Sequence, residues 1–97
     1  MAYANAIERL ALINGLRALA DFLESNPEVP APRYADVTVF PPHDSDVENR
    51  RDIDAIASLI CAGTELTQTY HHYRTSCRFG PVEYAAIAIP SKEIGEH

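Results

Sequence analysis

The sequence predicts an α+β fold, in which two helices pack on one face of a four-stranded, mainly antiparallel sheet. Two segments, 3–25 and 45–63, show apolar residues at helical spacing. Four further segments alternate between apolar and polar residues or are rich in Thr, Tyr, Val and Ile, as strands are: 34–40, 66–70, 73–79 and 82–89. The expected order of elements is therefore α-β-α-β-β-β.

Residues 3–25 are expected to form the first helix, because Ala, Leu, Glu and Arg dominate this segment and favour helices. Asn26-Pro27 is expected to end it, because a residue before proline is pushed out of the α region. The main apolar stripe of this helix consists of four leucines at helical spacing: Leu12, Leu16, Leu19 and Leu23.

The first two turns of this helix follow a different phase. Tyr3, Ile7 and Leu10 form a stripe of their own, which points well away from the leucines at about 100° per residue. Gly15 lies near the change of phase and costs about 1 kcal/mol relative to Ala inside a helix. Two explanations stay open. Either the helix breaks near Gly15, or residues 3–10 cover a second surface, such as a partner subunit.

A proline-rich connector, a strand and a capped helix follow. Three prolines between residues 27 and 32 predict a short, stiff link to the strand at 34–40. Ser45-Asp46-Val47-Glu48 fits the S-x-x-E capping box, so a helix is expected to begin there and to end at Gly63. Its buried face should consist of the residues at i, i+3, i+4 and i+7: Ile53, Ile56, Ala57 and Ile60.

Gly80-Pro81 marks a hairpin between the last two strands, and two registers are compatible with it. A two-residue loop would pair Phe79 with Val82, whereas a three-residue loop would pair Phe79 with Glu83. A shift of one residue turns every side chain of a strand to the other face. We expect the three-residue loop, or an equivalent bulge, because it brings the apolar residues of both strands to one face.

The length and net charge of the chain limit the classes of function that it can have. The chain has 97 residues, which is enough for a single domain over 1–97, with a helical extension at 1–11 and a flexible tail at 91–97. The formal net charge of -6 argues against general nucleic-acid binding. No apolar run approaches the roughly 20 residues of a membrane helix, and no secretory signal opens the chain, so we expect a cytoplasmic protein.

Histidines and cysteines are the candidates for metal binding or catalysis, and neither set forms a recognisable motif. Cys61 and Cys77 make no C-x-x-C pair and are expected to be reduced thiols. A structural zinc site needs four ligands, usually Cys and His at recognisable spacings. We therefore expect no catalytic residue, cofactor or metal. A small metal protein or enzyme that joins His43 to His71 and His72 is kept as an alternative.

Basic and aromatic residues gather on the last two strands. With the three-residue loop, Arg74, Ser76 and Arg78 share the sheet face away from the helices with Tyr84. Arg and Tyr are favoured at protein interfaces, so this face is a candidate binding surface. Sheets of this composition can also stack single-stranded bases, which makes single-stranded nucleic-acid binding a second alternative.

Three stretches resemble a group of small uncharacterised proteins encoded by actinobacteria and by phages that infect them. They are Leu16-Arg17-Ala18-Leu19-Ala20-Asp21-Phe22-Leu23-Glu24, Pro30 to Tyr34, and Arg78-Phe79-Gly80-Pro81-Val82-Glu83-Tyr84. The resemblance covers roughly residues 12–90. It carries no catalytic motif, and it implies an accessory protein with a phage or mobile-element setting.

These observations favour a non-enzymatic protein-interaction module with a protein partner, of which a homodimer is one form. The N-terminal helix and the free sheet face are the expected contact surfaces, through these residues: Tyr3, Ile7, Leu10, Arg74, Arg78 and Tyr84.

Overall fold

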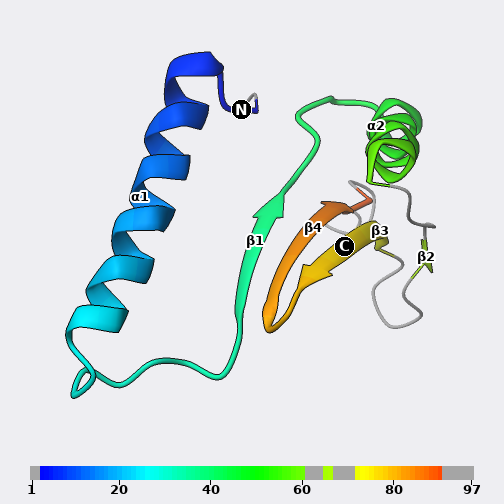
Figure 1. The fold of residues 1–97 in the computed structure, drawn as a ribbon. Helices are drawn as coiled ribbons and strands as arrows, with labels where there is room; N and C mark the ends of the chain where they lie inside the picture. Colours follow the sequence, from blue (N-terminus) through cyan, green and yellow to red (C-terminus); the bar gives the residue numbers. More distant parts are fainter. Residues whose placement is uncertain (1–2, 61–64, 67–71, 91–97) are drawn as a thin grey trace, which may run out of the picture. The chain divides into compact units, whose positions relative to one another are not determined.

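A computed structural model describes residues 3–60, 65–66 and 72–90 (Figure 1). It confirms the predicted α+β class, with the elements in the order α1, β1, α2, β2, β3, β4. The chain divides into two compact units, one formed by Tyr3–Arg33 and the other by the residues from Tyr34 onward. The two units are described separately below.

The first unit contains α1 (Ala6–Ser25), a continuous helix. Asn5 caps it: Asn5 Oδ1 accepts a hydrogen bond of 2.8 Å from the Glu8 amide, and Glu8 Oε1 accepts one of 3.0 Å from the Asn5 amide. The helix therefore begins at Ala6, later than predicted, and Tyr3 precedes it. The break considered near Gly15 is wrong, because one glycine costs only about 1 kcal/mol and strong helix formers flank it.

The second unit contains a mixed sheet built from β1 (Ala35–Val39), β3 (Tyr73–Phe79) and β4 (Val82–Ala88). Strand β4 lies in the middle, antiparallel to β3 and parallel to β1. The short β2 (Glu65–Leu66) pairs with the outer edge of β3. The sheet expected to be four-stranded and mainly antiparallel thus has three long strands and one parallel pair. The crossover that contains α2 makes the parallel pairing feasible. Most of the strand expected at 66–70 lies outside the described residues.

The β3–β4 hairpin has a two-residue loop, so the predicted three-residue loop is wrong. Phe79 pairs with Val82 across the turn. Gly80 has a φ of 63°, and a proline fixes its own φ at about −65°, so Gly80-Pro81 fits a type II′ turn. The geometry of this turn sets the register, whereas matching of apolar residues does not.

Helix α2 (Asp46–Leu59) packs on β3 and β4, near the ends of β1 and β4. As predicted, Ser45 caps it by accepting a hydrogen bond of 3.3 Å from the Glu48 amide. The predicted buried face is confirmed, since Ile53 and Ala57 are buried and Ile56 and Ile60 are half-buried. The helix ends earlier than expected, with Ile60 as its C-cap. Gly63 lies outside the described residues.

The core of the second unit is small and lies between α2 and one end of the sheet. It consists of Ile53, Ala86 and Ala88, with Val39, Ile56 and Tyr73 packed around them. The two buried strand residues of this core, Ala86 and Ala88, are small, which allows the helix to approach β4 closely. The prediction that helices cover one sheet face is therefore confirmed for α2, and it stays a prediction for α1.

Candidate interaction surfaces

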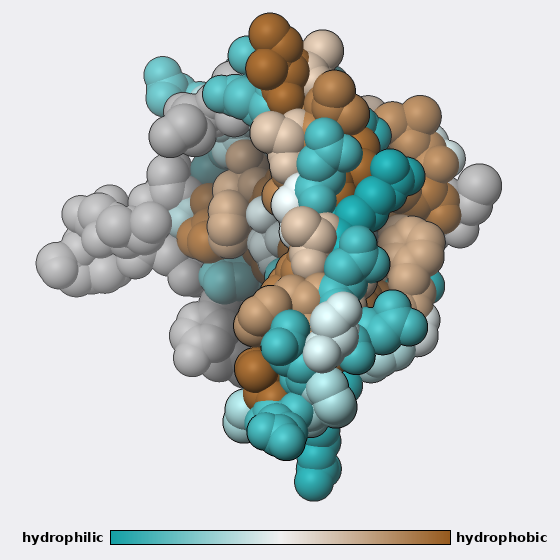
Figure 2. All heavy atoms as spheres, turned by 60° about the vertical axis from the view of Figure 1, so that its left-hand side comes forward, coloured by the Kyte–Doolittle hydropathy of each residue, from teal (hydrophilic) through white to brown (hydrophobic). Residues whose placement is uncertain are grey.

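The apolar surface of α1 is the largest candidate. We call Leu12, Leu16, Leu19 and Leu23 the leucine stripe. No residue of α1 is buried, and Leu12, Leu16, Leu19 and the neighbouring Phe22 are between 43% and 53% exposed. Figure 2, which brings forward the α1 side of Figure 1, shows apolar residues at the surface beside hydrophilic ones. Apolar side chains arranged in this way along a helix mark a contact surface.

The second predicted stripe of α1 is also exposed. Ile7 is 81% exposed, and Leu10 and Tyr3 are exposed as well. Tyr3 lies before the helix begins, so only Ile7 and Leu10 share a helical face. This stripe has fewer apolar side chains than the leucine stripe, and we treat it as the lesser surface.

The sheet face opposite α2 carries Arg74 and Arg78, as predicted, but acidic residues balance them. Glu83 Oε2 lies 3.5 Å from Arg74 Nη2 and 4.0 Å from Arg78 Nη2. Asp36 pairs with Glu83 in the sheet register, so it lies on the same face. Two carboxylates therefore offset two guanidinium groups, and this face is not a basic patch. Sequence reasoning missed Glu83 because its face depends on the hairpin register.

Tyr84 was predicted to lie beside the arginines, and the register shows that it does not. Cys77 lies directly opposite Tyr84, and both share the α2 face of the sheet. At the hairpin end of that face, beyond the core, lie several apolar residues that we call the distal patch: Val37, Cys77, Phe79 and Val82. Phe79 is 67% exposed and Cys77 is a half-buried free thiol. The distal patch is a further apolar surface of the sheet.

His43 belongs to a polar clamp at the start of α2. The Asn49 side chain donates a hydrogen bond of 3.1 Å to the His43 carbonyl oxygen and accepts one of 3.0 Å from the His43 amide. His43 Nε2 lies 3.0 Å from Asp52 Oδ2, and its Nδ1 lies 3.8 Å from Glu48 Oε1. These contacts hold the loop against the helix, which gives His43 a structural role.

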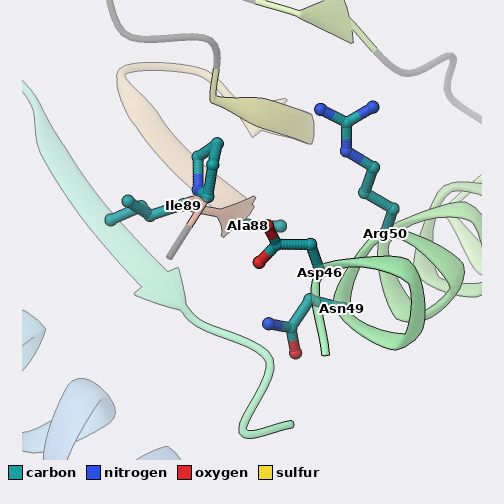
Figure 3. A pocket seen from close by; sticks show the side chains of 6 residues that line it. Asp46, Asn49, Arg50, Ala88 and Ile89 are labelled. Atoms are coloured by element: carbon teal, nitrogen blue, oxygen red, sulfur yellow. The ribbon is translucent and has the colours of Figure 1, made fainter. Parts of the chain in front are cut away.

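Next to this clamp the surface is hollowed, as Figure 3 shows. The lining comes from one turn of α2 and the end of β4: Asp46, Asn49, Arg50, Ala88, Ile89 and Pro90. Asp46 points toward Ala88, whereas Arg50 turns away toward β3 (Figure 3). The hollow measures about 10 Å³. Since pockets for small molecules measure roughly 300–1,000 Å³, it has no room for an ordinary substrate.

The histidine alternative finds no support in the described residues. Within them, no group of three His, Cys, Asp or Glu side chains could hold a metal ion. His71 and Cys61 lie outside the described residues. Across the described helices, none is long and apolar enough to cross a membrane.

Comparisons with known proteins found no match to this chain. No protein-family model, no curated protein and no solved structure matches it. The resemblance to proteins of actinobacteria and their phages therefore stays a prediction.

Proposed function

We propose that this chain is a non-enzymatic protein-interaction module, and that the leucine stripe of α1 is its main contact surface. The observation that carries the proposal is a helix of 20 residues that buries none of them and exposes large apolar side chains along its length. An amphipathic helix of this kind is a common form of protein-recognition element.

The energetics of an isolated helix support the proposal. Most helical stability in proteins comes from packing an apolar face, and α1 buries none of its 20 residues. Each large apolar side chain that moves from water into a contact contributes roughly 1.5–3 kcal/mol. Contact along the leucine stripe would therefore stabilise α1 and supply binding energy in the same step.

The two alternatives rest on weaker observations. The arginine face of the sheet is balanced by Glu83 and Asp36, so it lacks the positive field that nucleic-acid binding requires. No described observation favours a metal protein over an interaction module. The sheet face with Arg74 and Arg78 stays in the proposal as a second, polar contact surface.

Photocross-linking in cells tests the proposal. Leu16 is replaced by a photoreactive benzoyl-phenylalanine in the full chain, and the matched control carries the same group in place of Asp21, on the other side of the helix. We expect adducts between this chain and a second protein chain from position 16, and none from position 21. Adducts confined to one chain, or no adducts from position 16, would refute the proposal.

A further inference from the structure

No contact among the described residues explains Gly15. It lies in the interior of α1, where it costs about 1 kcal/mol relative to Ala. Its φ is not positive, so the backbone does not require glycine, and a Cβ built there would meet no atom within 4 Å. A glycine at this position leaves the helix surface flat. Its presence is explained if a large side chain from another molecule packs over it.

The spacing of the leucine stripe identifies which side chain that could be. Alternate spacings of four and three residues place the leucines at the d and a positions of a heptad. Gly15 and Phe22 then both occupy g positions, and Ile13 and Ala20 both occupy e positions. In an antiparallel pair of identical helices, g faces g and e faces e. Phe22 of one helix would thus lie beside Gly15 of the other, and Ile13 would lie beside Ala20, so that each large residue meets a small one.

We infer that α1 pairs with α1 of a second copy of this chain, in antiparallel orientation, through the leucine stripe. Leu16 lies beside the partner's Leu19, and Leu12 lies beside the partner's Leu23. Phe22 covers the partner's Gly15. In a parallel pair, g faces e instead, so Gly15 would lie beside the partner's Ala20 and no large side chain would cover it. The parallel pair therefore packs less well. This inference rests on the proposed function, because it names the occupant of the same surface.

Charge along α1 agrees with the antiparallel orientation. The last turn of α1 contains Glu24 and no basic residue, so nothing within the turn offsets the negative end of the helix dipole. In the antiparallel pair, Arg9 of one copy lies beside that end of the other. A parallel pair would place the two negative helix ends side by side, which is unfavourable.

The test is the dissociation constant of the full chain, measured by sedimentation equilibrium for four variants. Gly15→Leu should weaken the dimer at least about tenfold, because the new side chain takes the space of the partner's Phe22. Phe22→Ala should weaken it to a similar extent. The double variant Gly15→Leu/Phe22→Ala exchanges large for small, so its dissociation constant should return to within about threefold of wild type. Gly15→Ala is the matched control and should change it less than about threefold.

The recovery is diagnostic because residues 15 and 22 are two turns apart on one helix, about 10 Å along its axis, and meet only across an antiparallel pair. A monomeric wild-type chain, a dimer indifferent to Gly15→Leu, or a double variant without recovery would each overturn the inference. A monomer that still forms cross-links to another protein from position 16 would overturn this inference alone. Cross-links confined to one chain would also end the proposed function.

Discussion

The hydroxyl group of Tyr73 donates a hydrogen bond of 2.6 Å to Asp54 Oδ1, which joins β3 to α2. The Arg50 guanidinium carbon lies 5.1 Å from the centre of the same ring. The ring of Tyr73 also packs against the core of the second unit. One side chain therefore connects the helix to the sheet through apolar, polar and cation–π contacts.

Tyr73→Phe should lower the free energy of unfolding by about 1 kcal/mol, because it removes the hydrogen bond and keeps the ring. Urea denaturation of the full chain measures the change. Tyr34→Phe is the matched control, since Tyr34 is exposed, and it should leave stability unchanged. Equal stability of Tyr73→Phe and wild type would show that the hydroxyl contributes nothing.

Asn49→Ala should lower the free energy of unfolding by about 2 kcal/mol, because it leaves the His43 amide and carbonyl without their buried partner. His43→Ala keeps those backbone groups paired and removes only contacts with Asp52 and Glu48 at a partly exposed site. It should cost less than about 1 kcal/mol. If thermal denaturation ranks His43→Ala as the more damaging change, the clamp depends on the ring and not on the backbone.

Ile53→Val should destabilise the second unit by about 1 kcal/mol, because Ile53 is fully buried at the centre of the core. Ile53→Ala should cost about 3 kcal/mol, which could unfold so small a core, and the milder variant keeps the test measurable. Val47→Ala changes an exposed position of the same helix and should cost less than about 0.5 kcal/mol. Equal effects of Ile53→Val and Val47→Ala in denaturant titrations would contradict this packing.

Gly80→Ala should lower stability by about 1 kcal/mol, because L-residues other than glycine adopt a φ of this sign with strain. A Cβ at position 80 would meet no atom within 4 Å, so the cost comes from the backbone alone. Gly80→Asn should cost less than Gly80→Ala, since Asn tolerates positive φ better. Thermal denaturation that ranks Ala as equal to Gly would contradict the type II′ turn.

Local signals in the sequence predicted the elements well. The Ser45 cap and the stripe through Ile53 and Ala57 depend only on residues close in sequence, and the structure confirms both. The Asn5 cap could have been predicted from the same kind of signal, because Asn5 and Glu8 have capping-box spacing. The role of Asn49 was not predicted, because its hydrogen-bond partner, the His43 backbone, is known only from the fold.

Features that depend on long-range pairing were not predicted. The hairpin register followed from the conformation of Gly80-Pro81, and apolar matching pointed to the wrong alternative. In the observed register, Tyr84 lies on the α2 face of the sheet, and Glu83 lies on the opposite face beside Arg74 and Arg78. The parallel pairing of β1 with β4 has no local signal, because it depends on which strand edge is free after the hairpin forms.

Hydrogen–deuterium exchange of the α1 amides in the full chain, at several protein concentrations, tests the central claim most directly. Most helical stability in proteins comes from packing an apolar face, so the amides of α1, which buries no residue, exchange more slowly when that face is covered. We expect exchange in α1 to slow as the concentration of the chain rises, while exchange in β3 and β4 stays constant. Fast exchange in α1 at every concentration, or slow exchange that does not depend on concentration, would contradict self-association through the leucine stripe.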